Sequence, residues 1–339
     1  MKIAIATGIY PPEAGGPAYY AQGLAEALRS KGHAVRTVTY GALKKLPSGV
    51  RHFAYLLRLA PKMLRADAVI ALDTFSVELP AVIACGILRV PLVIRTGGDF
   101  LWEAYVERTN DPLPLPFFYE KHRPFTRKER IVFSLTRWTL AHANVIIFST
   151  RMQRDLWVKA YGITPEKTRI IGNAVEAPLS SEKPARQNFL WHVRPNAIKN
   201  GARAHVAFAR AKAEHPGIML EEGVMPKKKL LERMRSCYAV ILPSLTEISP
   251  NYILDALRFR KPFIMDKYSG LAQWLAPYGL LVDPLDEADI ARAIIELAST
   301  ECYARACEKA AAFAFTRTYA EVADDFLGLI KTVCEMAST

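Results

Sequence analysis

Several signatures that would settle a function at once are missing from this chain. Its five cysteines form no C-x-x-C pair and lie in apolar or helical contexts, which favours buried thiols over disulfides or a metal site. No G-x-G-x-x-G motif follows the first strand, which counts against a nicotinamide enzyme. Nor is there the lysine setting that a pyridoxal phosphate phosphorylase requires. Redox and metal chemistry are therefore not expected, and we predict no cofactor.

The chain also lacks a long apolar run. Its longest apolar stretch, Pro80 to Leu88, is stopped by Arg89 and Arg95, well short of the ~18 residues that a membrane-spanning helix requires. The first residues begin a strand at once, without the apolar core and cleavage site of a signal peptide. We therefore expect a cytoplasmic protein without a transmembrane helix.

What the chain does have is length, apolar content and positive charge. At 339 residues it exceeds what one hydrophobic core usually serves, so two domains are expected. Its 51% hydrophobic residues exclude the disordered class. The net charge of +12 predicts an acidic partner, which could be nucleic acid, anionic lipid or a phosphorylated substrate. No helix-turn-helix or aromatic-interleaved basic motif supports nucleic acid.

Short apolar strands alternate with helical segments along the whole chain, which predicts α/β architecture with parallel, doubly wound sheets. A polar, proline-containing stretch over 173–187 interrupts the alternation and is interpreted as a linker. We predict an N-terminal Rossmann-like domain over 1–175 and a second over 176–317. A terminal helix over 318–339 is expected to pack back on the first domain.

The segment from Pro243 to Leu257 follows an apolar strand and carries the clearest signal of a ligand site. Ser249 suits the N-cap of a helix and Pro250 its first position, so Asn251 and Tyr252 would offer free backbone N–H groups. Such groups at the carboxyl end of a parallel sheet bind anions, and a diphosphate would fit.

Two spaced pairs of charges accompany this helix start. Glu247 and Asp255 are eight residues apart and could accept hydrogen bonds from sugar or ribose hydroxyls. Earlier in the same predicted domain, Arg194 and Lys199 are five residues apart on a loop between a strand and a helix. Two fixed cations can neutralise a leaving diphosphate. The alternative for each pair is a solvated loop or a helix-capping acid.

The predicted first domain offers two further candidates. Gly15 and Gly16 follow the first strand and would allow close approach of a ligand, or form only a turn. Asp99 follows Gly97 and Gly98 at another strand end. We expect Asp99 to face the interdomain cleft and to be a candidate catalytic base.

These features together resemble retaining glycosyltransferase family 4, whose members carry an acidic–x7–acidic motif after Pro-Ser and an earlier Arg–x4–Lys pair. The resemblance implies a GT-B fold, in which two Rossmann-like domains face each other across a cleft and the C-terminal helix crosses back. It implies that Arg194 and Lys199 hold the donor diphosphate and that Glu247 holds the transferred sugar. The backbone near Asn251 would bind the phosphates, and Asp255 the ribose, without a metal.

Three departures from the family pattern bear on the donor. Asp255 stands where glutamate is usual, which shortens its reach by one methylene. The run Ile248 to Pro250 replaces a glycine-rich turn, and only a few residues separate Leu220 from the helix at Lys227, where the family has a longer insertion. These changes put the sugar, the base and the nucleotide affinity in question.

The resulting hypothesis is a cytoplasmic, metal-independent, retaining hexosyltransferase that uses a nucleotide-diphosphate sugar and a glycan or lipid-linked acceptor. The alternative is a GT-B-fold binding protein for nucleotide sugar or glycan that has lost catalysis. The stretch Arg51 to Arg65 mixes cations with bulky apolar residues, as membrane-surface helices do. It predicts peripheral contact with an anionic membrane, with a core-packed helix as its alternative.

Overall fold

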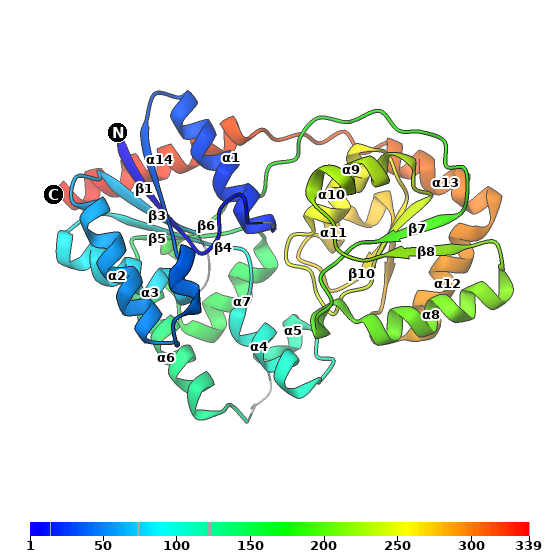
Figure 1. The fold of residues 1–339 in the computed structure, drawn as a ribbon, viewed down its shortest axis with the longest axis horizontal. Helices are drawn as coiled ribbons and strands as arrows, with labels where there is room; N and C mark the ends of the chain where they lie inside the picture. The colour runs from blue at the N-terminus through cyan, green and yellow to red at the C-terminus, as the bar shows by residue number, and fades with distance from the viewer. Residues whose placement is uncertain (14, 73–74, 121–123, 339) are drawn as a thin grey trace. The chain divides into compact units, whose positions relative to one another are not determined.

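A computed structural model describes residues 1–13, 15–72, 75–120 and 124–338 (Figure 1). The chain forms two compact units. Unit 1 comprises Met1–Leu101, His122–Ala174 and Arg317–Thr339, and unit 2 comprises Trp102–Lys121 and Val175–Thr316. The segment Trp102–Lys121 thus belongs to unit 2 although it lies in the first third of the sequence.

Unit 1 is built on a six-stranded parallel sheet with the order β2-β1-β3-β4-β5-β6. Every residue of β3 is buried, as is typical of a strand covered by helices on both faces. The strands are β1 (Lys2–Thr7), β2 (Ala34–Thr39), β3 (Ala68–Leu72), β4 (Leu92–Thr96), β5 (Val145–Phe148) and β6 (Thr168–Ile170).

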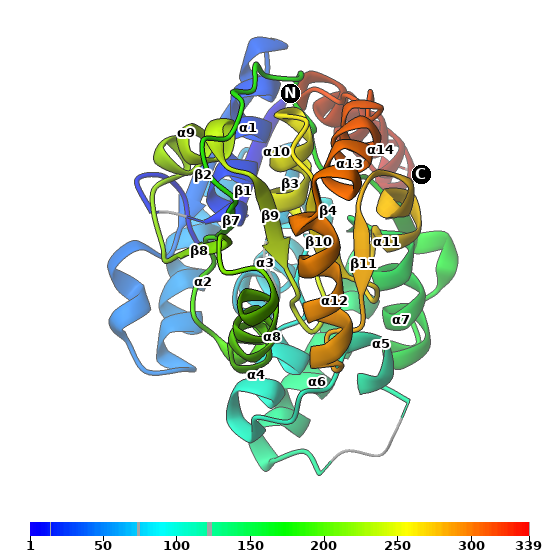
Figure 2. The same cartoon turned by 90° about the vertical axis from the view of Figure 1, so that its right-hand side faces the viewer.

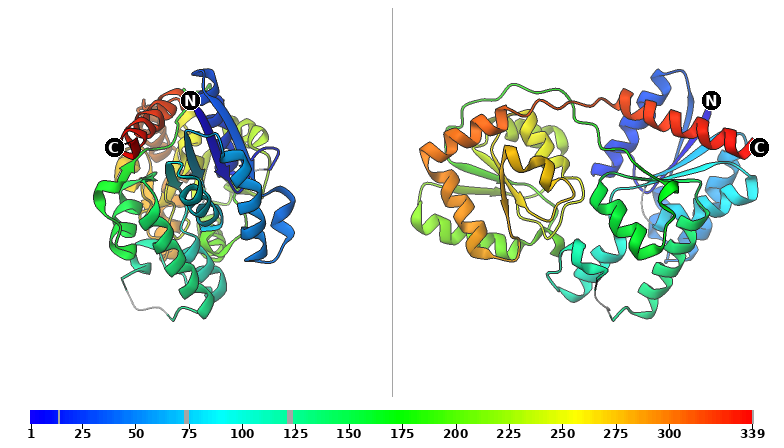
Figure 3. Two further views of the ribbon diagram at one scale, coloured as in Figure 1. Left: turned by 90° about the vertical axis from the view of Figure 1, so that its left-hand side faces the viewer. Right: turned by 180° about the vertical axis from the view of Figure 1, so that it is seen from behind.

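Helices cover both faces of this sheet (Figure 3). They are α1 (Gly16–Ser30), α2 (Val50–Met63), α3 (Phe75–Leu88), α6 (Arg127–His142), α7 (Arg151–Tyr161) and α14 (Tyr319–Ser338), with short 3-10 turns η1 (Gly41–Lys45) and η2 (Pro165–Lys167). The terminal helix α14 packs against α1, and its apolar stripe of Val322, Phe326 and Ile330 is fully buried. The 3.6-residue spacing of this stripe explains why the last segment is helical.

Unit 2 contains a five-stranded parallel sheet with the order β11-β10-β9-β7-β8. Its strands are β7 (Asn188–Trp191), β8 (Met219–Glu222), β9 (Ala239–Leu242), β10 (Phe263–Asp266) and β11 (Leu280–Val282). Its helices and 3-10 turns are α4 (Phe100–Thr109, beginning in unit 1), α5 (Leu115–Phe118), η3 (Ala197–Lys199), α8 (Gly201–Glu214), α9 (Lys227–Ser236), α10 (Asn251–Arg258), α11 (Ala272–Leu275), η4 (Ala276–Tyr278), α12 (Glu287–Ala298) and α13 (Thr300–Ala311). Helices α8 and α12 lie side by side on the sheet (Figure 2).

The strand order of unit 2 creates a topological switch point. The chain leaves β7, pairs β8 on one side of it, and returns to pair β9 on the other side. The connections after β7 and β9 therefore diverge to opposite sides at the carboxyl edge of the sheet, which is where open α/β folds bind ligands. Lys199 follows β7 and Glu247 follows β9, so both predicted residues lie at this point.

The α/β prediction is confirmed for both halves of the chain. Strands β3 and β9, each followed by a helix, illustrate the predicted alternation in the two halves. Among the described residues the five cysteines are free thiols, but only Cys85 and Cys237 are buried. Within these residues no helix combines the length and apolar character needed to cross a bilayer.

Candidate active site

The loop after β7 is held in place by Asn200. This residue has a positive φ of 60° between η3 and α8, a conformation that asparagine tolerates better than most residues. Its buried side-chain amide donates hydrogen bonds to the carbonyl oxygens of Pro243, at 3.0 Å, and Pro284, at 2.7 Å. The Leu245 N–H also donates to the Ile198 carbonyl at 2.8 Å. The loops after β7, β9 and β11 are thus tied together beside Lys199.

Lys199 and Glu247 form an ion pair across this edge of the sheet. The side chains are 20% and 16% exposed, so solvent screens the pair only partly. The backbone carbonyl of Glu247 accepts a hydrogen bond from the Gly270 N–H at 2.8 Å, which ties the β9 loop to the β10 loop. Two of the predicted site residues therefore meet, although they are 48 residues apart.

Tyr252 contributes through its side chain, which the sequence did not indicate. Its hydroxyl donates to the Leu190 carbonyl at 2.9 Å and accepts from the His192 N–H at 3.1 Å. Burial raises the pKa of this hydroxyl well above its usual value, so it stays a neutral donor. Tyr252 fixes the end of β7, where the loop carrying Arg194 begins.

The start of α10 differs from the prediction. The helix begins at Asn251, so Pro250 and not Ser249 occupies the N-cap position, and Pro250 provides no side-chain cap. The Asn251 N–H donates to the Ser249 carbonyl at 2.9 Å, so the prediction that it is free is wrong. A local turn thus uses the N–H group that the prediction assigned to an anion. The Tyr252 N–H has no hydrogen bond within the described residues and remains available for an anion.

Asp255 lies one turn into α10 and is nearly buried. Its carboxylate forms ion pairs with Lys227, at the start of α9, and with Arg258, at 3.2 Å. Arg258 also pairs with Glu176 at 2.7 Å. Two cations of the protein itself therefore compete with a ribose hydroxyl for the predicted ribose-binding carboxylate.

Asp266, the last residue of β10, is a component of the site that the sequence analysis missed. It is fully buried, and the backbone N–H groups of Glu247 and Tyr268 face its carboxyl without completing a hydrogen bond of good geometry. Burial, reinforced by the nearby Glu247 carboxylate, raises the pKa of Asp266 well above its usual value. The sequence signal that could have identified Asp266 is its position at the end of an apolar strand.

Buried polar atoms without a hydrogen-bond partner gather at the carboxyl edge of this sheet. Within the described part of unit 2 they belong to five residues at or just beyond the ends of β7, β9 and β10: Trp191, His192, Asn196, Ser244 and Asp266. Native proteins satisfy most buried polar groups, and exceptions often mark functional sites. This edge is therefore the best candidate for a polar ligand.

Arg194 lies on the same loop as Lys199 but is exposed and has no ion pair within the described residues. Its guanidinium is free to contact a phosphate. No cluster of three or more His, Cys, Asp or Glu side chains that could hold a metal occurs in the part of the chain that the structure describes.

Gly15 and Gly16 lie in unit 1 at the start of α1. Gly15 has a φ of 152° and its carbonyl accepts hydrogen bonds from the N–H groups of Ala18, at 3.1 Å, and Tyr19, at 3.2 Å. A Cβ at Gly15 would come within 3.1 Å of Ile9. Glycine is thus required here by the backbone of the turn itself.

Asp99, the predicted base of unit 1, is hydrogen-bonded to α7. It is fully buried within unit 1, and its carboxylate accepts a hydrogen bond from the Trp157 Nε1–H at 2.8 Å. The neighbouring Gly98 carbonyl accepts from the Gln153 amide at 2.8 Å. These bonds tie the loop after β4 to α7. That Asp99 acts as a base stays a prediction.

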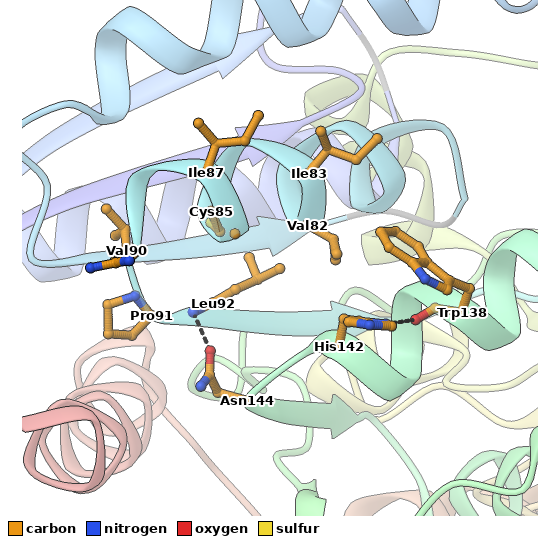
Figure 4. Close-up of a pocket in the computed structure, with 12 residues that line it drawn as sticks. Val82, Ile83, Cys85, Ile87, Val90, Pro91, Leu92, Trp138, His142 and Asn144 are labelled. Carbon is orange, nitrogen blue, oxygen red and sulfur yellow. Dashed lines mark hydrogen bonds between the residues drawn. The ribbon is translucent and has the colours of Figure 1, made fainter. Parts of the chain in front are cut away.

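A cavity of about 570 Å³ lies in unit 1 (Figure 4). Its lining is mainly apolar and includes Val82, Ile87, Leu92 and Trp138. Leu92 begins β4, so this cavity is at the amino edge of the sheet, opposite the edge at which α/β folds bind ligands. It is not the predicted site.

Comparison with known families and structures agrees with this geometry. Residues 14–177 match Glycosyltransferase Family 4, and residues 200–300 match Glycosyl transferases group 1. A comparison with curated protein sequences finds no match.

Several solved structures share the fold over the whole chain. Anabaena Alr3699/HepE in complex with UDP and glucose has a TM-score of 0.64 at 14% identity and covers 100% of this chain and 99% of that one. Sucrose-phosphate synthase from Thermosynechococcus elongatus has a TM-score of 0.68 at 15% identity, with 100% coverage of both chains. WaaG, a glycosyltransferase involved in lipopolysaccharide biosynthesis, has a TM-score of 0.63 at 14% identity and 99% coverage of both. With two parallel α/β sheets and family matches over both halves, the chain belongs to the GT-B glycosyltransferases, in family 4.

Proposed function

We propose that this glycosyltransferase moves a sugar, with retention and without a metal, from a nucleotide-diphosphate sugar to a glycan or lipid-linked acceptor at the cytoplasmic face of a membrane. The observation that carries the proposal is the carboxyl edge of the unit 2 sheet. There the Lys199–Glu247 pair lies at the switch point, among the buried polar atoms that lack partners. The complex of Anabaena Alr3699/HepE with UDP and glucose supports the class of donor.

The chemistry follows from the charges at this edge. The Lys199 ammonium and the exposed Arg194 guanidinium would stabilise the negative charge that develops on the leaving diphosphate. The Tyr252 N–H, at the positive end of α10, adds a neutral donor to the same oxygen atoms. When the diphosphate pairs with the Lys199 ammonium, the Glu247 carboxylate becomes free to accept hydrogen bonds from the sugar hydroxyls. The ion pair therefore holds both groups ready until a donor binds.

The test is donor hydrolysis and transfer with UDP-, GDP-, ADP- and dTDP-linked sugars, with the anomer of the transferred sugar followed by NMR. We expect one donor class to react, with the product keeping the configuration of the donor. Activity in excess EDTA tests metal independence. Inversion, or loss of turnover in EDTA, would refute the corresponding part of the proposal. Binding without any turnover would instead favour a binding protein, which the ion pairing of Asp255 with Lys227 and Arg258 also favours.

We further propose that α2 places the protein on an anionic membrane. Its inner face buries Tyr55, Leu59 and Met63, whereas Phe53 and Leu57 on its outer face are 63% and 60% exposed. Residues 27–66 contain no acidic residue, and the cations within and beside α2 in the sequence are Lys44, Lys45, Arg51, Arg58, Lys62 and Arg65, of which Lys44 pairs with Glu13. Apolar insertion and attraction to anionic headgroups act together on such a helix.

Vesicle co-sedimentation tests this surface. Vesicles with phosphatidylglycerol should bind the protein more tightly than pure phosphatidylcholine vesicles, and high salt should weaken the binding. The double variant Phe53→Ser/Leu57→Ser should lose at least about tenfold in affinity, since each buried apolar side chain contributes ~1.5–3 kcal/mol. Ile87→Ser on α3, an apolar position that is at least as exposed, is the matched control. Equal binding of the double variant and the control would contradict the proposal.

A further inference from the structure

The segment Trp102–Phe118, here named the arm, lies between β4 and β5 in the chain, yet it belongs to unit 2. It comprises most of α4, a proline-containing turn and α5 (Figure 1). The Trp102 indole donates to the Leu113 carbonyl at 2.8 Å, and the rings of Tyr105 and Phe118 lie 5.4 Å apart. Leu115 and Phe118 are fully buried. The arm is therefore a packed element.

The arm contacts three separate loops at the carboxyl edge of the unit 2 sheet. The Glu107 carboxylate accepts a hydrogen bond from the Ala197 N–H at 2.8 Å, in the connection after β7. The Leu115 N–H donates to the Thr246 hydroxyl at 3.0 Å, in the connection after β9. The Phe117 ring meets the Tyr268 ring edge-on at 5.2 Å, in the connection after β10.

Each contact lies within a few residues of the Lys199–Glu247 pair. Ala197 opens the single 3-10 turn that ends at Lys199, and Thr246 directly precedes Glu247. Tyr268 lies two residues before Gly270, whose N–H holds the Glu247 carbonyl. The loops that carry Lys199 and Glu247 are thus held by contacts with the arm as well as by the sheet.

Thr246 is the most constrained of these contacts. It is 3% exposed, and its hydroxyl donates to the Leu245 carbonyl at 2.6 Å. Since that bond uses the only hydroxyl proton, the oxygen faces Leu115 as an acceptor. Removing this oxygen would leave the Leu115 N–H buried without a partner, which is unfavourable.

We propose that the arm is a positioning element of the transfer reaction, in which Glu107 and Thr246 hold the loops of Lys199 and Glu247 in the geometry that the donor requires. This inference rests on the proposed function. Fixing loop residues in advance removes the entropic cost of ordering them from the binding and reaction steps. Misplacement of a reacting group by about 1 Å can cost on the order of 100-fold in rate.

The experiment compares Glu107→Leu, Glu107→Gln and Thr246→Val with the wild type. Glutamine keeps an oxygen that can accept from the Ala197 N–H, so it is the rescue variant, whereas leucine and valine remove the acceptor. Amide hydrogen exchange is measured first, because it needs no donor. Exchange at Ala197 should be faster in Glu107→Leu and unchanged in Glu107→Gln, and exchange at Leu115 should be faster in Thr246→Val. Unprotected Ala197 and Leu115 amides in the wild type would overturn the contacts, whatever the function.

Turnover is measured next, with the donor that reacts in the panel of nucleotide sugars described above. We expect kcat to fall at least about tenfold in Glu107→Leu and Thr246→Val, with a smaller change in KM, and to recover in Glu107→Gln. Melting temperatures separate positioning from folding, since a purely structural role would lower them without a loss of kcat in the folded fraction. Faster exchange with unchanged kcat would overturn the positioning role. If the wild type turns over no donor, the proposed function fails, while the exchange data still decide whether the arm holds the loops.

Discussion

Two acidic residues occupy comparable places in the two sheets and have opposite surroundings. Asp99 follows β4 of unit 1 and is fully buried against Trp157, whereas Glu247 follows β9 of unit 2 and is partly exposed in an ion pair with Lys199. The first carboxylate satisfies a neutral indole donor inside the protein. The second is paired with a cation that could instead bind a diphosphate.

Position after a strand therefore does not determine the partner of a carboxylate, which in both cases comes from a distant part of the chain. Trp157 is 58 residues from Asp99, and Lys199 is 48 residues from Glu247. Substitutions at Lys199 and at Asp99 should therefore separate loss of activity from loss of stability.

The largest effect is expected for Lys199→Ala. Removing one preorganised charge from a developing anion costs on the order of 100- to 1000-fold in kcat. The measurement is single-turnover donor cleavage, with circular dichroism to show that the variant is folded. A kcat within about threefold of the wild type would contradict the role of Lys199.

Asp99→Leu should instead reduce stability by about 1–3 kcal/mol, because the Trp157 N–H loses its buried acceptor. Asp99→Asn keeps an acceptor oxygen and should recover much of this loss. Urea unfolding measures both variants. If Asp99→Asn abolished transfer while the protein stayed folded, Asp99 would be catalytic after all.

The smallest effect is expected at Asp266, as a change in pH dependence. The pKa of the Asp266 carboxyl is raised in the folded state. Such a group contributes least to stability at a pH above this raised pKa. Its contribution is fully present below the unfolded pKa near 4 and decreases as the pH rises toward the folded pKa. The free energy of unfolding of Asp266→Asn should therefore decline less than that of the wild type between pH 5 and about 8. Parallel pH profiles for the two proteins would contradict the raised pKa of Asp266.

Much of the fold could be predicted from local sequence patterns, whereas the candidate site could be predicted only in part. Buried strands such as β3 and β9 are short apolar runs, and the stripe of α14 has helical spacing, so both were predictable. The Arg194, Lys199 and Glu247 candidates came from spacing and resemblance. The roles of Asn200, the Tyr252 hydroxyl, Thr246 and Asp266 depend on contacts between loops, which no periodicity encodes. The arm was missed for the same reason.

The central claim is that the donor diphosphate binds at the carboxyl edge of unit 2, next to Lys199. Calorimetric titration of UDP, GDP, ADP and dTDP into the wild type, Lys199→Ala and Asp99→Asn tests it most directly. The account predicts that one nucleotide binds the wild type and Asp99→Asn alike and binds Lys199→Ala at least about tenfold more weakly, as expected for a lost charge-assisted contact of ~1.5–3 kcal/mol. Unchanged affinity in Lys199→Ala would contradict it.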